Sequence, residues 1–205
     1  MTEASDSSKT NAAQAPTPSV GPTVESDAAA VSSKTVSSDT AGQHRASAPR
    51  LVRCAVITVS DTRTLADDTG GALLVEKLQS AGHEIVAREI IPDDPARMRA
   101  LVSKLCQRDD VAAILLTGGT GVSRRDQTFE TISELLTKTM TGYGELFRML
   151  SYQEIGPAAM LSRAIGGLVG QTVVLSMPGS PKAVRLAMDR LILPELGHLV
   201  HEANR

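Results

Sequence analysis

Three short, nearly unbroken apolar runs constrain this chain more than any other feature. They are LVRCAVITV at 51–59, VAAILL at 111–116 and TVVLSM at 172–177. Each run is too short for a buried helix and lacks the polar alternation of a half-exposed strand, so it fits a strand that is buried on both faces. Such strands are typical of parallel sheets that helices cover on both sides. The runs therefore predict an α/β fold.

Amphipathic segments separate these runs. A helix is predicted over 69–80, and the segment after Asp94-Pro95 repeats apolar residues at the i, i+3, i+4, i+7 spacing of another. Further helices are predicted at 129–136, 144–155 and 182–193, a strand at 83–91, and a turn between two short strands at 166–170. Strands that alternate with helices of this length indicate βαβ units and a mainly parallel sheet. In such sheets ligands bind beyond the carboxyl ends of the strands.

The first 50 residues differ in composition from the rest of the chain. Ser, Thr or Ala occupies 26 of them, and none is aromatic. A stretch of this kind buries too little apolar surface to offset the entropy lost on ordering. We therefore predict a disordered tail over 1–50 and one folded domain over 51–205.

Charge and cysteine usage exclude several classes of protein. The formal net charge is −2, whereas binding to a phosphate backbone needs an excess of basic charge, so we do not expect a nucleic-acid partner. No apolar run approaches the length of about 18 residues that predicts a membrane span, and the N-terminus lacks the apolar core of a signal peptide. Cys54 and Cys106 do not form a CxxC pair and are predicted to be free core thiols in a reducing compartment. We therefore expect a cytoplasmic protein that has no membrane partner.

A glycine-rich loop, TGGTG at 117–121, follows the third predicted strand. Its glycines can adopt positive φ and approach a ligand closely, so that successive amides can point at one anion. The loop is not a dinucleotide fingerprint, because Arg124 stands where the third glycine should be, and it is not a P-loop, because no GK[ST] follows. A tight turn that binds nothing is the alternative. The candidate binding residues of the loop are Thr117, Gly118, Gly119, Thr120 and Gly121.

Charged residues flank this loop. Arg124 and Arg125 suit bidentate contacts to phosphate, and Asp126 suits a Mg²⁺ ion that bridges phosphate oxygens. The alternative for Asp126 is a helix N-cap. Asp93 follows another predicted strand and is the candidate for a second carboxylate at the same metal, the alternative being an ordinary turn residue.

A second loop, PGSPK at 178–182, opens the last predicted helix. Ser180 is the expected N-cap, and Lys182 adds a positive charge near a helix N-terminus that favours an anion. A helix start without a ligand is the alternative. All four aromatic residues lie within 129–152, where they could stack on a flat ring, bury a subunit contact or pack in the core. His198 and His201 lie near Glu195 and Glu202, but their loose spacing favours a solvated helix face over a metal site.

Six segments, taken in order, resemble the MoaB/Mog family of molybdenum cofactor biosynthesis proteins. They are SDT (60–62), IPDD (91–94), LLTGGTGVSRRDQT (115–128), GYGELFRMLSYQEIG (142–156), AMLSRA (159–164) and MPGSPKAV (177–184). The resemblance covers about residues 51–200, and the forms FRMLSYQEIG and PGSPKAV are similar to the MoaB branch.

This resemblance implies a three-layer α/β sandwich with a mainly parallel central sheet, the molybdopterin-binding fold of the family, which assembles as a homotrimer or higher. It implies binding of molybdopterin, a pterin dithiolene that carries a phosphate. It also implies adenylylation of molybdopterin with Mg-ATP, which gives adenylyl-molybdopterin and pyrophosphate, after which a partner protein inserts molybdate. The alternatives are a non-catalytic molybdopterin-binding or scaffold protein and a trimeric interaction module.

The resemblance also assigns residues by position. Asp93 and Asp126 match the two acidic residues tied to metal and catalysis, and Thr117–Gly121 matches the loop for pterin and phosphate. Arg125 and Lys182 are added as substrate-binding candidates because of their charge. The residues that line up with other binding segments of the family are Ser60, Asp61, Glu145, Ser162, Arg163, Gly179 and Ser180.

Overall fold

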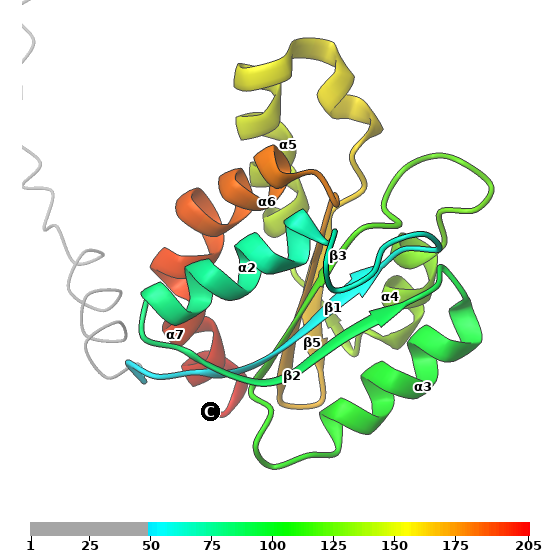
Figure 1. Ribbon diagram of the computed structural model, residues 1–205. Helices are drawn as coiled ribbons and strands as arrows, with labels where there is room; N and C mark the ends of the chain where they lie inside the picture. Colours follow the sequence, from blue (N-terminus) through cyan, green and yellow to red (C-terminus); the bar gives the residue numbers. More distant parts are fainter. Residues whose placement is uncertain (1–48) are drawn as a thin grey trace, which may run out of the picture. The chain divides into compact units, whose positions relative to one another are not determined.

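The computed structural model describes residues 49–205 (Figure 1). The predicted N-terminal tail, apart from its last two residues, lies outside the described residues. In chain order, the elements are β1 (Arg53–Val59), α2 (Thr69–Ser80), β2 (Glu84–Ile91), α3 (Pro95–Cys106), β3 (Ala113–Thr117), α4 (Thr128–Leu135), β4 (Lys138–Thr139), α5 (Thr141–Ile155), the 3₁₀ helix η1 (Gly156–Leu161), β5 (Ile165–Val169), β6 (Thr172–Met177), α6 (Pro181–Ala187), the π-helical turn η2 (Met188–Ile192) and α7 (Leu193–Ala203).

The strands form one mixed sheet with the order β2-β1-β3-β6-β5-β4. Strands β2, β1, β3 and β6 are parallel to one another, whereas β5 pairs antiparallel with both β6 and β4. The prediction of a mainly parallel sheet is confirmed. Because the four parallel strands run in one direction, their carboxyl ends meet at one edge of the sheet.

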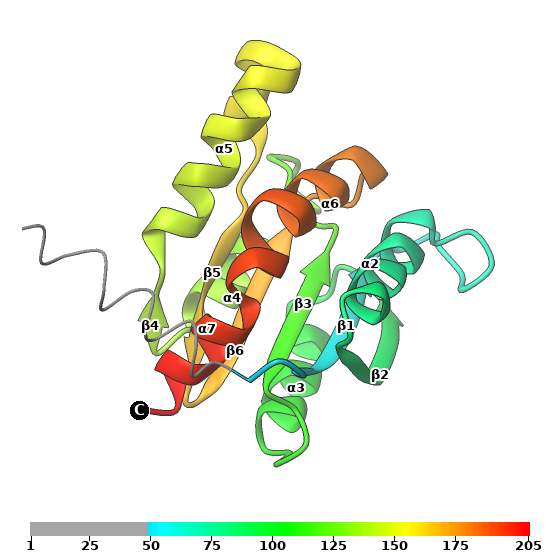
Figure 2. The same cartoon turned by 90° about the vertical axis from the view of Figure 1, so that its left-hand side faces the viewer.

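Helices cover both faces of the sheet, so the domain has three layers (Figure 2). Helices α2, α5, α6 and α7 pack on one face, and α3 and α4 pack on the other. The side chains of β1 alternate between the two cores: Cys54 and Val56 join the first, and Ala55 and Ile57 join the second. This alternation follows from the two-residue period of a strand, and it confirms that the apolar run is buried on both faces.

Two predicted elements are wrong. The segment 166–170 is not a turn between strands, because Ile165–Val169 is itself strand β5 and the turn to β6 lies at Gly170, where φ is +60°. The final helix does not end near residue 193, since α6 continues through the π-helical turn into α7 as far as Ala203. Pro194 lies in the first turn of α7, a position where the missing proline N–H is tolerated, and the wider π-helical turn comes directly before this helix.

The two cysteines are free, as predicted, but only one is a core residue. Cys54 is fully buried on β1, and burial raises the pKa of its thiol to about 12. Cys106 is half-buried at the end of α3. Within residues 49–205, no helix has the length and apolar character needed to cross a membrane.

Candidate functional site

Three adjoining cavities lie at the carboxyl ends of β1, β3 and β6. The first, here called the acidic cavity, has a volume of about 340 Å³ and is lined by Asp61, Asp93 and Asp126. The second lies beside the start of α2 and measures about 360 Å³, and the third lies beside α5 and measures about 450 Å³. The TGGTG loop contributes to the lining of all three. The loop that the sequence singled out is therefore the common wall of one extended site.

Two features of the TGGTG loop suit the binding of an anion. Gly118 and Gly119 have φ values of +102° and +64°, a region that glycine occupies without strain. Within residues 49–205, the amides of Gly119, Thr120 and Gly121 donate to no protein acceptor. Three consecutive amides without partners can turn towards one bound anion.

Close backbone packing joins three segments beneath this loop. A Cβ atom on Gly118 would lie 2.2 Å from the carbonyl oxygen of Val59, and one on Gly70 would lie 2.6 Å from that of Gly179. Gly179 in turn touches Gly118, since its own Cβ would lie 3.3 Å from the Gly118 Cα. We call Gly70, Gly118 and Gly179 the glycine junction. It lets the start of α2 and the loops after β3 and β6 approach without side chains between them.

Asp93 and Asp126 both lie against the TGGTG loop. A Cβ atom on Gly119 would lie 2.5 Å from Asp93 Oδ2, and one on Gly121 would lie 2.7 Å from Asp126 Oδ2. The alternative of a helix N-cap for Asp126 is wrong, because Gln127 is the N-cap of α4 and has no side-chain cap. Instead, Asp126 Oδ2 accepts a hydrogen bond from the Ser123 amide at 3.1 Å. Carboxylates from two different strand ends thus meet in the acidic cavity.

The surroundings of the Asp93 carboxylate shift its pKa. Partial burial raises its pKa above the usual value, and the negative charges of Asp126, Asp61 and Glu130 raise it further. One hydrogen bond opposes these effects, since Asp93 Oδ1 accepts from the Gln127 amide at 3.1 Å. A group of like charges that raises a carboxyl pKa is also a place where a cation is stabilised.

A buried hydroxyl supports the fit of a metal-phosphate group at this point. Thr128 is fully buried, and its Oγ1 atom has no hydrogen-bond partner among the described residues. A Cβ on Gly119 would lie 2.1 Å from that oxygen, so Thr128 Oγ1 and Asp93 Oδ2 share the space that the glycine leaves open. No group of three or more His, Cys, Asp or Glu side chains within residues 49–205 could hold a metal ion alone. The two carboxylates therefore suit Mg²⁺ that arrives with phosphate oxygens as its other ligands.

Asp61 ties two loops of the acidic cavity together. Its Oδ1 atom accepts from the Asp93 amide at 3.2 Å, and its Oδ2 atom forms an ion pair with Arg125. Arg125 was predicted to bind phosphate directly, but in this conformation its guanidinium is held by Asp61. Ser60 lines the same cavity, and its hydroxyl accepts from the Arg63 amide at 3.2 Å.

Arg163 spans the loop that carries Asp126. Its guanidinium donates to the carbonyl oxygen of Thr120 at 3.4 Å and to that of Asp126 at 3.0 Å, and it forms an ion pair with Glu130. Its Cζ atom lies 5.2 Å from the centroid of the Phe129 ring. With these partners Arg163 holds the two ends of segment 120–126, and the substrate contact predicted for it stays a prediction.

The remaining predicted site residues lie in different places. Thr117 is fully buried, and its hydroxyl donates to the Pro178 carbonyl at 3.3 Å. Ser180 caps α6, since its hydroxyl accepts from the Ala183 amide at 3.2 Å, and both Gly179 and Ser180 line the second and third cavities. Lys182 is exposed on α6 and lines none of the three cavities.

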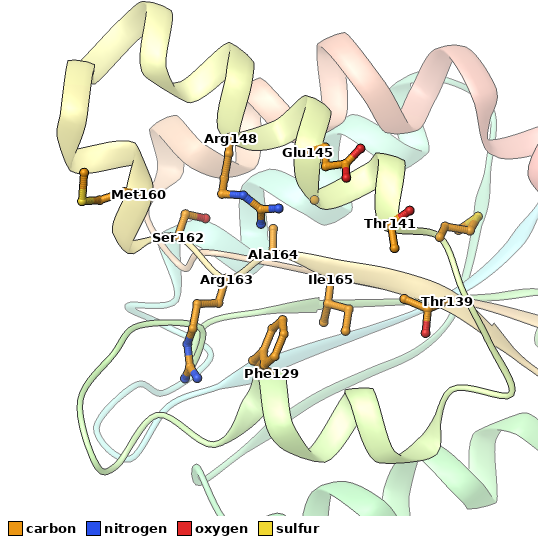
Figure 3. A pocket seen from close by; sticks show the side chains of 12 residues that line it. Phe129, Thr139, Thr141, Glu145, Arg148, Met160, Ser162, Arg163, Ala164 and Ile165 are labelled. Atoms are coloured by element: carbon orange, nitrogen blue, oxygen red, sulfur yellow. The ribbon is translucent and has the colours of Figure 1, made fainter.

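Glu145 belongs to a fourth cavity, which we call the edge pocket. It has a volume of about 370 Å³ and lies between α5, α4 and the start of β5 (Figure 3). Arg148 extends from α5 towards Ala164, and the Phe129 ring rises from α4 on the opposite side (Figure 3). Ser162 lines both the edge pocket and the cavity beside α5, so the two adjoin.

Thr128 and Arg148 were not among the predicted site residues. The hydroxyl of Thr128 has no local signature, because a threonine at a helix start usually caps it. Arg148 lies within the GYGELFRMLSYQEIG segment, and its i+3 spacing from Glu145 was the available signal that both side chains share one face of α5.

Known proteins share much of this sequence. Residues 55–198 match a protein-family model described as "Probable molybdopterin binding domain". The chain is 52% identical over 164 residues to molybdenum cofactor biosynthesis protein B of Bacillus cereus, a match that covers 80% of this chain and 97% of the relative.

Solved structures give the same result. A crystal structure of a molybdenum cofactor biosynthesis protein B is 53% identical, has a TM-score of 0.75, and is matched over 77% of this chain and 99% of its own. The tungsten cofactor synthesizing protein MoaB from Pyrococcus furiosus is 36% identical, with a TM-score of 0.69 and coverage of 77% and 100%.

Proposed function

Because this chain belongs to the molybdenum cofactor biosynthesis protein B family of molybdopterin-binding domains, we propose that it adenylylates molybdopterin with Mg-ATP. One observation carries the proposal. The carboxylates of Asp93 and Asp126 both face glycines of a loop that has three unpartnered amides among the described residues. A site built this way holds a cation and phosphates together.

The reaction is a nucleotidyl transfer. A terminal phosphate oxygen of molybdopterin attacks the α-phosphorus of ATP, the bond between the α-phosphorus and the bridging oxygen breaks, and pyrophosphate leaves. Mg²⁺ held by Asp93 and Asp126 would neutralise charge on the phosphate oxygens. The chain needs to do little covalent chemistry, so positioning and charge stabilisation provide most of the rate enhancement.

The residues of the chain divide this work. The amides of Gly119, Thr120 and Gly121 would hold the molybdopterin phosphate, and the hydroxyl of Thr128 would donate to an oxygen beside Gly119. Arg163 would keep segment 120–126 in place so that Asp126 faces the cavity. Arg125 could leave Asp61 and turn to a nucleotide phosphate, since both groups are partly exposed.

The test is release of pyrophosphate from ATP in the presence of molybdopterin. We expect Asp126→Asn to lose at least about 100-fold in rate, because the amide keeps the size of the side chain but cannot bind the cation as a charged ligand. The matched control is Asp109→Asn, an exposed residue before β3 at the opposite edge of the sheet, which we expect to keep full activity. Full activity in Asp126→Asn would refute the metal-ligand role. Binding of molybdopterin without pyrophosphate release in the wild type would instead identify a non-catalytic carrier.

The proposal extends to the assembly and location of the protein. Leu146, Met149 and Tyr152 follow the i, i+3, i+6 spacing of one helix face, and their exposed fractions are 47%, 52% and 61%. An exposed apolar stripe of this kind supports a subunit contact in a homotrimer or higher assembly, which light scattering after size exclusion would measure. We further propose that the protein acts in the cytoplasm and passes its product to a molybdate-insertion partner.

A further inference from the structure

We propose that a cavity between α5 and α7 binds a small carboxylate with an apolar body, and that Tyr143 and Arg190 bind its carboxylate group. The cavity, here called the α5–α7 cavity, has a volume of about 360 Å³. It shares no lining residue with the three cavities at the carboxyl ends of the strands. The inference therefore goes beyond the proposed function and does not depend on it.

Four elements on one face of the sheet line this cavity. Helices α5 and α7 pack on the same face, and side chains of β6 and of the π-helical turn η2 complete the lining (Figure 2). Gly166 of β5 makes room for two of these side chains, because a Cβ there would lie 2.5 Å from Leu175 Cδ2 and 3.0 Å from Tyr143 Cδ1. The lining is mainly apolar, and a cavity of this size can hold a small ligand.

A buried hydroxyl group of this lining lacks a partner. The Tyr143 Oη atom is buried and forms no hydrogen bond within residues 49–205. Burial also raises the pKa of this phenol above its usual value, so the group stays protonated and remains a donor at neutral pH. An unpaired buried donor costs free energy, and a ligand oxygen atom that accepts from it would remove that cost. An apolar side chain of another molecule would fill the cavity without doing so.

The charged residues of the lining favour an anion. Arg190 is exposed in η2, and its guanidinium has no ion pair or hydrogen bond among the described residues. It can therefore turn towards the ligand oxygen atoms that Tyr143 contacts. Glu195 also lines the cavity, but its carboxylate is hydrogen-bonded to His198 Nδ1 at 2.9 Å. The guanidinium and the phenol both donate, so a carboxylate is the group that suits them.

The π-helical turn supports a functional interpretation of this cavity. Arg190 and Leu191 line the cavity from η2, where the helix widens between α6 and α7. Turns of this kind are rare and occur frequently at functional sites. The turn that interrupts the regular helix is thus the element that supplies the cation.

The test compares three eight-carbon probes that differ only in the head group: octanoate, octanol and octylammonium. Isothermal titration calorimetry of the full chain should show that the wild type binds octanoate at least about tenfold more tightly than octanol, because hydrogen bonds to a charged acceptor are stronger. Octylammonium should bind most weakly, since its head group carries the same charge as Arg190.

Two variants separate the groups that bind the carboxylate. Arg190→Gln should weaken octanoate about tenfold and leave octanol unchanged. The matched control is Arg185→Gln, an exposed residue of α6 that does not line the cavity, and it should bind both probes as the wild type does. Tyr143→Phe should weaken octanoate and octanol alike, by at least about threefold, because both oxygens accept from the phenol. The hydroxyl that it removes has no partner among the described residues, so this variant should be as stable as the wild type.

Intrinsic fluorescence locates the probe. The chain has no tryptophan and two tyrosines, so Tyr143 is the single tyrosine of the Tyr152→Phe variant. Octanoate should change the tyrosine emission of this variant with the same midpoint as the calorimetric titration. Octanoate binding without a change in emission would place the ligand elsewhere and overturn the inference.

The remaining outcomes also decide the inference. Equal affinities of the wild type for octanoate and octanol, an Arg190→Gln variant that keeps the preference for octanoate, or a Tyr143→Phe variant with wild-type affinities would each overturn it. So would loss of octanoate binding as the chain associates at higher concentration, measured by light scattering, because a second copy of the chain would then cover the cavity.

Discussion

Replacing Gly119 by alanine tests the role of the glycine loop most directly, because the chain contains a matched control. Gly119 and Gly170 have nearly the same backbone angle, with φ values of +64° and +60°. Their surroundings differ. A Cβ at Gly119 would lie 2.1 Å from Thr128 Oγ1 and 2.5 Å from Asp93 Oδ2, whereas one at Gly170 would meet nothing within 4 Å.

The two alanine variants should therefore differ in the free energy of unfolding. An alanine at positive φ costs roughly 1–2 kcal/mol, and this cost applies to both sites. At Gly119 two side chains must also move, and overpacking of this kind costs about 1–3 kcal/mol more. We expect Gly170→Ala to lose about 1–2 kcal/mol and Gly119→Ala about 2–5 kcal/mol, with urea denaturation followed by circular dichroism as the measurement.

Function should separate the two variants further. The new methyl group at Gly119 occupies the space shared by Thr128 Oγ1 and Asp93 Oδ2, so we expect Gly119→Ala to lose molybdopterin-dependent pyrophosphate release while Gly170→Ala keeps it. Equal stability losses in the two variants, or an active Gly119→Ala protein, would show that the space beside Gly119 is not needed.

Two other predictions concern the loop and its carboxylate. Arg163→Leu should speed amide hydrogen exchange across 121–126, because the hydrogen bonds from the guanidinium to both ends of that segment are lost. The control Arg99→Leu breaks an exposed ion pair with Glu134 and should leave this exchange unchanged. Unchanged exchange in Arg163→Leu would contradict the role of Arg163 in holding the segment. The pKa of Asp93 is higher in the folded chain than in the unfolded chain, so protonation of this carboxyl stabilises the folded state. This stabilisation is fully present at a pH below the pKa of the unfolded chain, and it is lost as the pH rises through the pKa of the folded chain. Asp93→Asn should therefore have a higher midpoint of urea denaturation than the wild type at pH 7, and the difference should shrink as the pH falls below the pKa of the folded chain. The variant should be inactive. Equal midpoints at pH 7 would contradict this account of the Asp93 charge.

Much of the fold could be predicted from local patterns. Helix α2 (Thr69–Ser80) and strand β6 (Thr172–Met177) have the predicted bounds. The helix is an amphipathic segment that a glycine follows, and the strand is an apolar run between turn residues, so both have clear ends in the sequence. The meeting of Asp93 and Asp126 could also be anticipated, since parallel strands place their carboxyl ends at one edge. The chemical roles assigned to these two residues stay predictions.

What could not be predicted depends on contacts between distant segments. Strand β5 has two adjacent glycines, which normally weaken a strand, and only its antiparallel pairing with β6 makes it one. Arg163 reaches the Thr120 and Asp126 carbonyls across a sequence gap of about 40 residues, and no local pattern marks such a pair. The unpartnered hydroxyl of Thr128 likewise becomes visible only when Gly119 lies beside it.

The glycine junction links ligand recognition to cooperative folding. Gly70, Gly118 and Gly179 belong to segments far apart along the chain, so the floor of the pocket exists only after the last parallel strand has docked. A partly folded intermediate that lacks β6 would thus have no affinity for ligand. A ligand at 100 times its Kd would raise the free energy of unfolding by about 2.7 kcal/mol. Bound substrate therefore stabilises only the completely folded domain, and the rise in melting temperature that it causes reports on the domain as a whole.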